Sequence, residues 1–284
     1  MPGLIIHGGA GRARPRSQRD TIAEALEHIA RAAWGQLGRG AAALDVAIWA
    51  AKALEDNPLF NAGLGSKLQA DGGARLSASL MDGTLERFSG VVNVEGLLNP
   101  IELAAALQME QDRVLDGAGA LRRARALGMV EGDVRTPASI ENWQRAIEGE
   151  TGTIGAVVLD NDGHIAAATS TGGRGMERTG RVSDSCTVAG NYATPLAGAS
   201  CTGVGEDIVD GALATRLVHS IEAGDTIEQA SDKLTTRMAT KGWRAGLIAM
   251  DHTGAWVAPH TTEIMYWVAI DERGEHRFAD PSTQ

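Results

Sequence analysis

The chain has 284 residues, 43% of them hydrophobic, so it is long enough for one large domain or two with a sizeable core. Its formal net charge of −10 argues against a general nucleic-acid binder. The seven histidines are dispersed and the cysteines lack metal-ligand spacing, which argues against a zinc site. Because the chain has no basic leader and no apolar run of about 18 residues, we expect a cytoplasmic protein that does not span a membrane.

The first half of the chain alternates strand patterns with helix patterns. In chain order we expect a strand at 4–7, helices at 21–37 and 41–56, strands at 67–70, 75–81 and 88–94, and helices at 100–108, 112–127 and 137–148. Asn57 and Pro58 end the second helix, because proline and the residue before it disfavour helical backbone. The polar, glycine-bearing segment 128–152 is the expected linker of the chain.

The second half begins with a β-hairpin and continues with two long helices and three strands. We expect helices at 205–223 and 226–241, and strands at 245–250, 255–259 and 263–270. Strands therefore cluster at the start, middle and end, which indicates an α+β fold with two packed sheets covered by helices. Cys186 and Cys201 could pair, although two thiols in an enzyme-like chain are more often reduced.

The hairpin joins residues 152–159 to residues 164–173 through a turn of Asp, Asn, Asp and Gly. A three-residue loop places Thr153 opposite Thr171, whereas a two- or four-residue loop places it opposite Ser170. Either register sets a cluster of hydroxyl groups beside the first residue of a strand.

Thr153 is the candidate nucleophile of this hairpin. Threonine is a good strand former, so a purely structural role is the plainer interpretation. Two observations favour chemistry: glycines at 152 and 155 flank Thr153, and a polar stretch leads into it. If the chain were cut before Thr153, this residue would carry a hydroxyl nucleophile and a free amine as its base. The ordinary α-amino pKa is roughly 7.7–8.0, so part of the amine is neutral near pH 7.

Ordered motifs spread over nearly the whole chain resemble the plant-type asparaginase / isoaspartyl peptidase family of N-terminal-nucleophile hydrolases. They are HGGAG at 7–11, NPLFNAG at 57–63, SLMDG at 79–83, GTIGAV at 152–157, TSTGG at 169–173, GRVSDS at 180–185 and SCTG at 200–203. The resemblance implies a four-layer α/β/β/α sandwich and one hydrolase domain, 1–284. It also implies self-cleavage between Gly152 and Thr153 into an α-chain of 1–152 and a β-chain of 153–284.

The resemblance implies a role for each residue of the catalytic centre. Thr153 attacks a side-chain amide carbonyl and forms a β-aspartyl enzyme, and the Thr171 hydroxyl supports it. Thr202 and the backbone N–H of Gly203 match the oxyanion positions, and Asn61 assists the nucleophile. The plainer interpretations are a loop turn at Thr202 and Gly203 and a loop-capping amide at Asn61.

Arg181 and Asp184 are the candidate substrate-binding residues. A surface ion pair is the plainer interpretation, and it typically contributes about 0–1 kcal/mol. In the functional interpretation, the arginine binds the α-carboxylate of the substrate and the aspartate accepts from its α-ammonium group. L-asparagine and β-aspartyl (isoaspartyl) dipeptides both carry these two groups, and the resemblance implies this use.

No cofactor is expected, but the resemblance implies a structural sodium ion bound by backbone carbonyls of the loop 54–64. The expected ligands are the carbonyls of Leu54, Glu55, Asn57, Phe60, Ala62 and Leu64. The resemblance also implies a homodimer of cleaved protomers that acts on a small-molecule amino-acid or dipeptide substrate, with no nucleic acid or membrane as a partner.

The sequence departs from the family pattern in three places. Ser77 stands where relatives commonly have Asp, and Ser183 replaces a common Gly. Because of these two departures, the substrate preference can differ from that of the family. The linker before Gly152 is short for the family. Linker length affects the efficiency of self-cleavage, because the linker must present the Gly152–Thr153 peptide bond in a strained geometry.

Two alternative functions stay open. A glycosylasparaginase-like hydrolase is one, although that branch commonly has Asp where this chain has Gly152. An uncleaved, non-catalytic homologue that binds an amino acid through Arg181 and Asp184 is the other. A nucleotide-binding enzyme is remote, because the Gly-x-Gly pairs at 63–65 and 203–205 lack a third glycine at the right offset.

Overall fold

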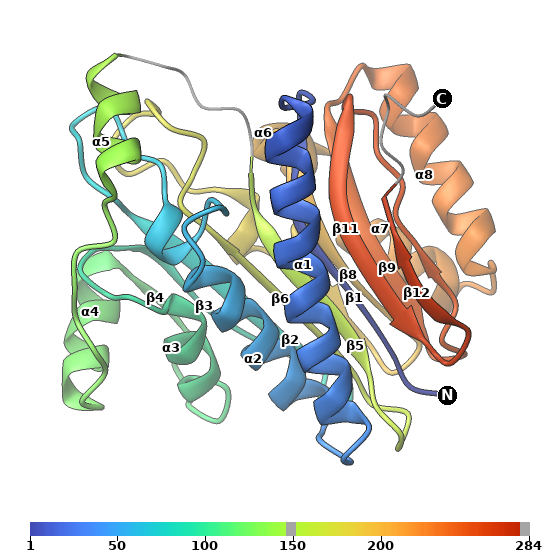
Figure 1. Cartoon of the computed structure of the whole chain (residues 1–284). Coiled ribbons are helices and arrows are strands. Elements are labelled where there is room, and N and C mark those ends of the chain that lie inside the picture. Colours follow the sequence, from blue (N-terminus) through green and yellow to red (C-terminus); the bar gives the residue numbers. More distant parts are fainter. Residues whose placement is uncertain (146–151, 279–284) are drawn as a thin grey trace.

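The computed structural model describes residues 1–145 and 152–278, which form a mixed α+β fold with two β-sheets (Figure 1). The larger sheet has the order β12 (Gly274–Arg277), β11 (Ile264–Asp271), β1 (Gly3–Gly11), β5 (Ile154–Leu159), β6 (Ile165–Thr171), β2 (Leu76–Asp82), β3 (Arg87–Val94) and β4 (Val114–Asp116). The smaller sheet has the order β10 (Trp256–Val257), β9 (Ala245–Asp251), β8 (Ala197–Gly203) and β7 (Asn191–Ala193).

The helices lie outside the sheets. They are α1 (Arg16–Leu37), α2 (Ala43–Glu55), α3 (Pro100–Ala106), α4 (Gly117–Ala126), α5 (Pro137–Gln144), α6 (Gly205–Gly211), α7 (Leu213–Glu222) and α8 (Ile227–Lys241), with short 3-10 helices η1 (Gly63–Gly65) and η2 (Asp184–Cys186). In the described part of the chain, no helix is long and apolar enough to cross a membrane.

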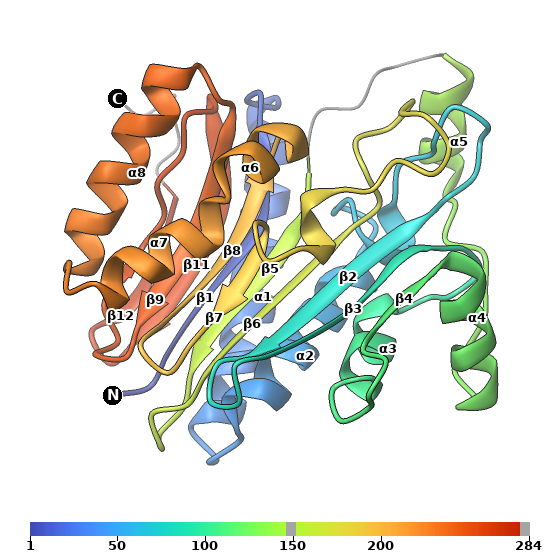
Figure 2. The same ribbon diagram turned by 180° about the vertical axis from the view of Figure 1, so that it is seen from behind.

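Three hydrophobic clusters hold these elements together. Helices α1 and α2 cover one face of the larger sheet (Figure 1), with Leu26 and Val158 in the same cluster. Helices α7 and α8 lie beside β8 and β9 (Figure 2), where Leu217 and Leu247 share a second cluster. A third cluster joins β5 to β9 through side chains such as Val157, so the two sheets face each other. The core between the sheets positions the residues at the end of β5.

The hairpin has the register of the three-residue loop. Leu159 pairs with Ile165 and Ile154 pairs with Ser170, and the Asp160 N–H donates to the His164 carbonyl at 3.1 Å. Gly163 at the end of the turn has φ of +84°, the left-handed conformation that glycine adopts without strain. Of the two registers that the sequence allowed, the structure therefore has the one that sets Thr171 opposite Thr153.

Two predicted helices are corrected by tertiary contacts. The predicted helix at 205–223 is two helices, because Ala212 takes a left-handed conformation (φ 47°, ψ 48°) that redirects the chain so that α7 packs on the smaller sheet. The predicted helix at 112–127 begins as strand β4, which pairs with β3, and α4 starts only after the Asp116 side chain accepts from the Gly119 N–H at 3.3 Å.

Several strand predictions are wrong where the alternation of apolar and polar residues in the sequence is weak. The predicted strand at 67–70 is irregular, since its N–H groups bond to a turn and to the Glu177 carbonyl instead of to a strand. The sequence also missed β7, β8 and β12. The expected linker 128–152 contains α5, which starts with a capping box between Thr136 and Ser139, and part of it lies outside the described residues. Cys186 and Cys201 are both buried and free, so they do not pair.

Candidate active site

Thr153 lies directly before β5, and 5% of its surface is exposed. Its hydroxyl donates to the Thr171 hydroxyl at 3.3 Å, and the Thr171 hydroxyl lies 3.4 Å from the Gly152 carbonyl oxygen. The Gly173 N–H donates to Thr171 as well, at 3.1 Å, which fixes the orientation of this side chain. The structure therefore joins the candidate nucleophile, its supporting hydroxyl and the peptide bond expected to be cut.

Asn61 lies against the same peptide bond. Its side-chain amide nitrogen donates to the carbonyl oxygens of Gly152 and Gly173, and its oxygen accepts from the Lys67 N–H at 2.9 Å. Gly9, at φ +115°, closes the other side, where a β-carbon would lie 3.0 Å from the Gly152 Cα atom. The Gly152 carbonyl, which the expected self-cleavage would polarise, is thus already hydrogen-bonded to the Asn61 amide.

His7 is a buried residue of the site that sequence reasoning missed. Its Nε2 lies 3.1 Å from the Ser200 hydroxyl, which lies 2.6 Å from the Thr169 hydroxyl. Burial lowers the pKa of His7 to about 3, so the imidazole is neutral and links the larger sheet to β8. The signal was present in the HGGAG motif and in Gly155, whose missing side chain leaves room for the imidazole.

A small recess adjoins Thr153. Its lining brings together Gly152, Thr153, Thr171, Gly173, Arg174, Arg181, Ser183, Asp184, Gly203 and Gly205. Asp184 is 2% exposed and accepts from the Ser183 hydroxyl at 2.9 Å, while its second oxygen has no hydrogen-bond partner among the described residues. Burial raises the pKa of Asp184 to about 6.

Arg181 forms its ion pair with Glu206 and not with Asp184. Its Nε lies 2.8 Å from one Glu206 oxygen and its Nη2 lies 2.9 Å from the other, a bidentate contact. Sequence reasoning missed Glu206. The signal was that Glu206 is an acidic residue in the first turn of α6 and follows Gly205 directly. A β-carbon at Gly205 would lie 2.6 Å from the Arg181 guanidinium, so the glycine leaves room for the arginine.

Thr202 and Gly203 do not form a loop, because they end strand β8. Thr202 is 0% exposed, and its hydroxyl oxygen accepts from the Ala10 N–H at 3.1 Å. A hydroxyl that accepts one hydrogen bond still has its own proton to donate. Gly203, at φ +136°, is among the lining residues of the recess, and Thr202 is not.

The two serine departures have different places in the site. Ser183 lines the recess and holds the Asp184 carboxylate through its hydroxyl. Ser77 lies outside the recess, where its oxygen accepts from the Asn93 N–H at 3.1 Å. The Asn93 side chain then donates to the Arg181 carbonyl at 3.1 Å, so Ser77 reaches the site only through one intermediate.

The loop expected to bind sodium runs from the end of α2 to η1. Gly63, at φ +50°, passes closely against the Glu55 carbonyl, and Gly65 passes against the Phe60 carbonyl, so side chains at these glycines would fill the interior of the loop. Three other carbonyls of the expected set accept backbone N–H groups within the same segment: those of Leu54, Asn57 and Ala62. Burial raises the pKa of the Glu55 carboxyl group to about 8, and it accepts from the Ser170 hydroxyl at 2.6 Å.

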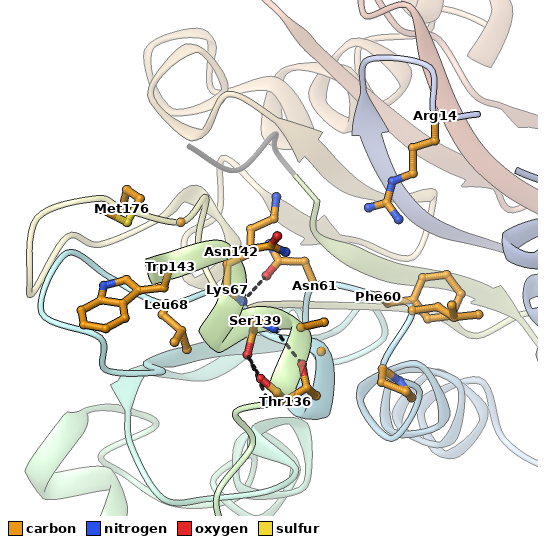
Figure 3. Close-up of a pocket in the computed structure, with 15 residues that line it drawn as sticks. Arg14, Phe60, Asn61, Lys67, Leu68, Thr136, Ser139, Asn142, Trp143 and Met176 are labelled. Carbon is orange, nitrogen blue, oxygen red and sulfur yellow. Dashed lines mark hydrogen bonds between the residues drawn. The ribbon is translucent and has the colours of Figure 1, made fainter. Parts of the chain in front are cut away.

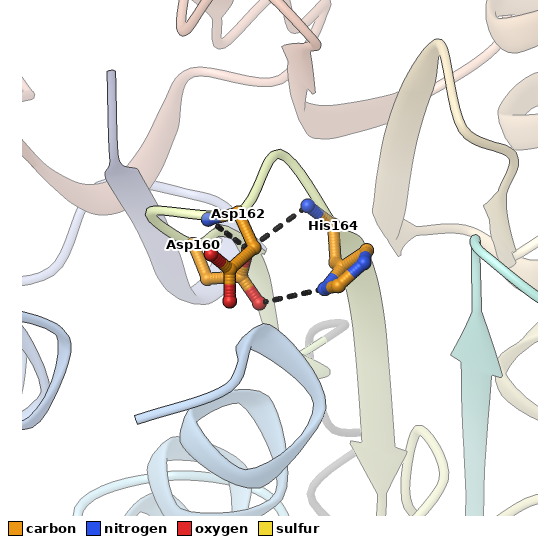
Figure 4. A group of neighbouring side chains, drawn as sticks. All are labelled: Asp160, Asp162 and His164. Carbon is orange, nitrogen blue, oxygen red and sulfur yellow. Dashed lines mark hydrogen bonds and ion pairs between the residues drawn. The ribbon is translucent and has the colours of Figure 1, made fainter. Parts of the chain in front are cut away.

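A cluster of Asp160, Asp162 and His164 lies close together at the turn of the hairpin (Figure 4). The strand pairing places this turn at the opposite end of the hairpin from Thr153. The Asp160 carboxylate accepts from the N–H groups of Ala43, Asp162 and His164 at 2.9–3.0 Å. These contacts fix the turn and satisfy the start of α2, so we assign this cluster a structural role.

Comparison with known proteins shows the family of this chain. A family model described as asparaginase matches residues 1–151 and 144–279. The chain therefore belongs to the asparaginase family. It is 44% identical over 276 residues to an isoaspartyl peptidase/L-asparaginase of Synechocystis sp., covering 90% of this chain and 84% of that protein. It is 36% identical over 282 residues to a plant-type L-asparaginase of Thermococcus kodakarensis, covering 89% and 91%. It is 35% identical over 298 residues to the human isoaspartyl peptidase/L-asparaginase, covering 99% and 96%.

Proposed function

We propose that this protein is a self-processing hydrolase that cleaves isoaspartyl dipeptides and the side-chain amide of L-asparagine through a threonine acyl-enzyme. The observation that carries the proposal is the hydroxyl pair of Thr153 and Thr171 in one recess with Arg181 and Asp184. The names of the relatives above support the same substrates. We further propose that the two facing sheets and their outer helices form the α/β/β/α sandwich of N-terminal-nucleophile hydrolases.

The first reaction is self-cleavage. The Thr153 Oγ attacks the Gly152 carbonyl carbon, and the bond from that carbon to the Thr153 nitrogen breaks. The hydroxyl proton passes to the departing Thr153 nitrogen, and an ester forms. Hydrogen bonding from Asn61 stabilises the negative charge that develops on the Gly152 carbonyl oxygen. Water then hydrolyses the ester, which frees the Gly152 carboxylate and leaves Thr153 with a free amine.

The second reaction uses that amine. It takes the proton of the Thr153 hydroxyl as the oxygen attacks the side-chain carbonyl of the substrate, and it returns the proton to the departing nitrogen. Arg181 binds the α-carboxylate of the substrate and Asp184 accepts from the α-ammonium group, while Glu206 orients the arginine. Ammonia or an amino acid leaves, and water hydrolyses the remaining aspartyl ester.

The overall proposal is tested on the purified protein. A denaturing gel should show two fragments, 1–152 and 153–284, and the smaller one should begin Thr-Ile-Gly on N-terminal sequencing. Cleaved protein should hydrolyse L-asparagine and a β-aspartyl dipeptide. A stable intact chain that binds aspartate without turnover would favour the binding homologue, and turnover of glycosylated asparagine in preference to both substrates would favour the glycosylasparaginase branch.

A sodium ion and a dimer complete the proposal. The Glu55 carbonyl packs against Gly63 and the Phe60 carbonyl packs against Gly65. Backbone oxygens of this kind would bind a small cation, which would stabilise the loop that carries Asn61. We propose no other cofactor. Self-cleavage in sodium-free buffer and after sodium is restored tests the ion, and light scattering of the cleaved protein tests the homodimer.

Arg181→Ala is expected to weaken substrate binding and to leave self-cleavage intact. Loss of a charge-assisted contact costs about 1.5–3 kcal/mol, so KM for L-asparagine should rise about 10- to 150-fold. The measurement is steady-state hydrolysis by cleaved enzyme. Arg178→Ala, an exposed arginine of the same loop, is the matched control. Unchanged kinetics in Arg181→Ala would show that this arginine serves only as the partner of Glu206.

Asp184→Asn is expected to stabilise the fold above pH 6. The folded-state pKa of Asp184, about 6, lies above its ordinary value of 3.8, so the folded state binds more protons and stability falls as pH rises between these values. Removing the buried charge should raise the free energy of unfolding by about 1–3 kcal/mol at pH 8 and have little effect at pH 4. Thermal melts across this range test it, with the exposed Asp210→Asn as the control. A melt that is lowered equally at all pH values would contradict the prediction.

A further inference from the structure

A second and larger groove is lined in part by Asn61 (Figure 3). It has a volume of about 260 Å³ and is open to solvent. We call it the Asn61 groove and define it by Arg14, Phe60, Asn61, Lys67, Trp143 and Met176, which line it. The reaction steps above use only Asn61 of this set.

We propose that the Asn61 groove binds the leaving residue of an isoaspartyl dipeptide, and that it favours an apolar amino acid with a free α-carboxylate. This inference rests on the proposed function and deepens it, because it assigns the part of the substrate that L-asparagine lacks.

The position of the Thr153 nitrogen determines where the leaving residue lies. The amine must return its proton to the departing nitrogen, so the two nitrogens have to be within hydrogen-bond reach. In the uncut chain the Thr153 nitrogen is bonded to Gly152, and Asn61 contacts the Gly152 carbonyl. Self-cleavage breaks the bond between Gly152 and Thr153, so the position beside the Thr153 nitrogen that Gly152 occupied becomes free for the leaving residue. The leaving residue therefore extends from Thr153 towards Asn61, while Arg181 and Asp184 hold the aspartyl half in the recess.

Asn61 forms the partition between the two spaces. Its amide nitrogen bonds to the carbonyls of Gly152 and Gly173, which both line the recess, and its side chain lines the groove. The chain segment that follows Gly173 also passes from one space to the other, because Arg174 lines the recess and Met176 lines the groove. A dipeptide that reacts at Thr153 can thus place one residue on each side of Asn61.

The chemistry of the groove fits a carboxylate attached to an apolar side chain. Arg14 points its guanidinium group into the groove (Figure 3), and Lys67 adds a second cation. No described residue of the lining carries a carboxylate, although the whole chain has a net charge of −10. Leu68, Trp143 and Met176 supply an apolar wall.

The apolar wall is built before any ligand arrives. The Trp143 indole N–H donates to the Ala70 carbonyl at 3.3 Å, and a β-carbon at Gly72 would lie 3.0 Å from its ring. The Met176 N–H donates to the Leu68 carbonyl at 2.8 Å. Preorganised walls reduce the entropy lost on binding, so small changes here should alter selectivity without refolding the site.

The test compares kcat/KM of cleaved enzyme for β-aspartyl-leucine, its C-terminal amide and L-asparagine. Arg14→Ala should lower the value for β-aspartyl-leucine about tenfold, as expected for one charge-assisted contact. The values for the amide and for L-asparagine should stay within about twofold, because neither presents a carboxylate to the groove. Arg14→Lys should retain most of the wild-type selectivity, and Arg16→Ala, an exposed neighbour, is the matched control.

A second variant tests the apolar wall. Trp143→Ala should lower kcat/KM for β-aspartyl-leucine and its amide about tenfold, but not the value for β-aspartyl-glycine or L-asparagine. Equal losses on all substrates, or no change on β-aspartyl-leucine in either variant, would overturn the inference. Hydrolysis of L-asparagine by the wild-type enzyme separates the outcomes, since its absence would reject the proposed function itself.

Discussion

Thr153→Ala is expected to abolish self-cleavage and hydrolysis together, leaving one chain of 284 residues on a denaturing gel. The physical reason is that one residue supplies both reacting groups: its hydroxyl attacks Gly152 in the first reaction, and its freed amine activates that hydroxyl in the second. The measurement is a time course of the gel with an assay of released ammonia from L-asparagine.

Two controls separate chemistry from folding in this experiment. Thr153→Ser keeps a hydroxyl in the same hydrogen-bonded position beside Thr171, so it should still be cut, although at a different rate. Thr240→Ala, which removes a helix-surface hydroxyl on α8, should behave as wild type. Cleavage at the same bond in Thr153→Ala, or turnover by its uncut chain, would reject the mechanism.

Thr202→Val is expected to slow hydrolysis about 10²–10³-fold with little change in substrate affinity. An oxyanion donor acts in the transition state, so its removal lowers kcat rather than raising KM. The substitution should also lower the stability of the fold. The Thr202 oxygen accepts from the Ala10 N–H, so valine leaves this N–H without its partner and should lower the free energy of unfolding by about 1–3 kcal/mol.

Single-turnover hydrolysis on cleaved enzyme, with thermal melting alongside, distinguishes these two effects. Thr202→Ser keeps the hydroxyl and should retain most of the activity and the hydrogen bond from Ala10. If Thr202→Val hydrolyses asparagine as fast as wild type, the oxyanion role belongs to another group. If Thr202→Ser fails as badly with a normal melt, the methyl group rather than the hydroxyl is what the site needs.

The sequence by itself determined the local structure around the nucleophile. Hairpin register depends on the turn, so the sequence set either Thr171 or Ser170 opposite Thr153, and the three-residue loop of the structure selects Thr171. The helices at 21–37, 41–56 and 226–241 were predictable for a similar reason, since their apolar faces repeat at helical spacing and α1, α2 and α8 occupy these segments.

Only the tertiary structure decided how distant segments meet. Helix propensity continues through Ala212, but packing of α7 on the smaller sheet breaks the helix there. Arg181 and Asp184 are three residues apart in the sequence, yet their surroundings differ. Arg181 pairs with the exposed Glu206, whereas Asp184 is buried and its pKa is raised. Burial is a property of the whole fold, so spacing could not predict it.

The surroundings of the scissile bond show the same division. The sequence marked Gly152, Thr153 and Asn61, because each lies in a motif that can be read locally. The hydrogen bonds from Asn61 to Gly152, from Ala10 to Thr202 and between His7 and Ser200 connect residues about 90 to 190 positions apart. No local pattern encodes such contacts, because they form only when the two sheets pack face to face and bring the ends of β1, β5 and β8 together.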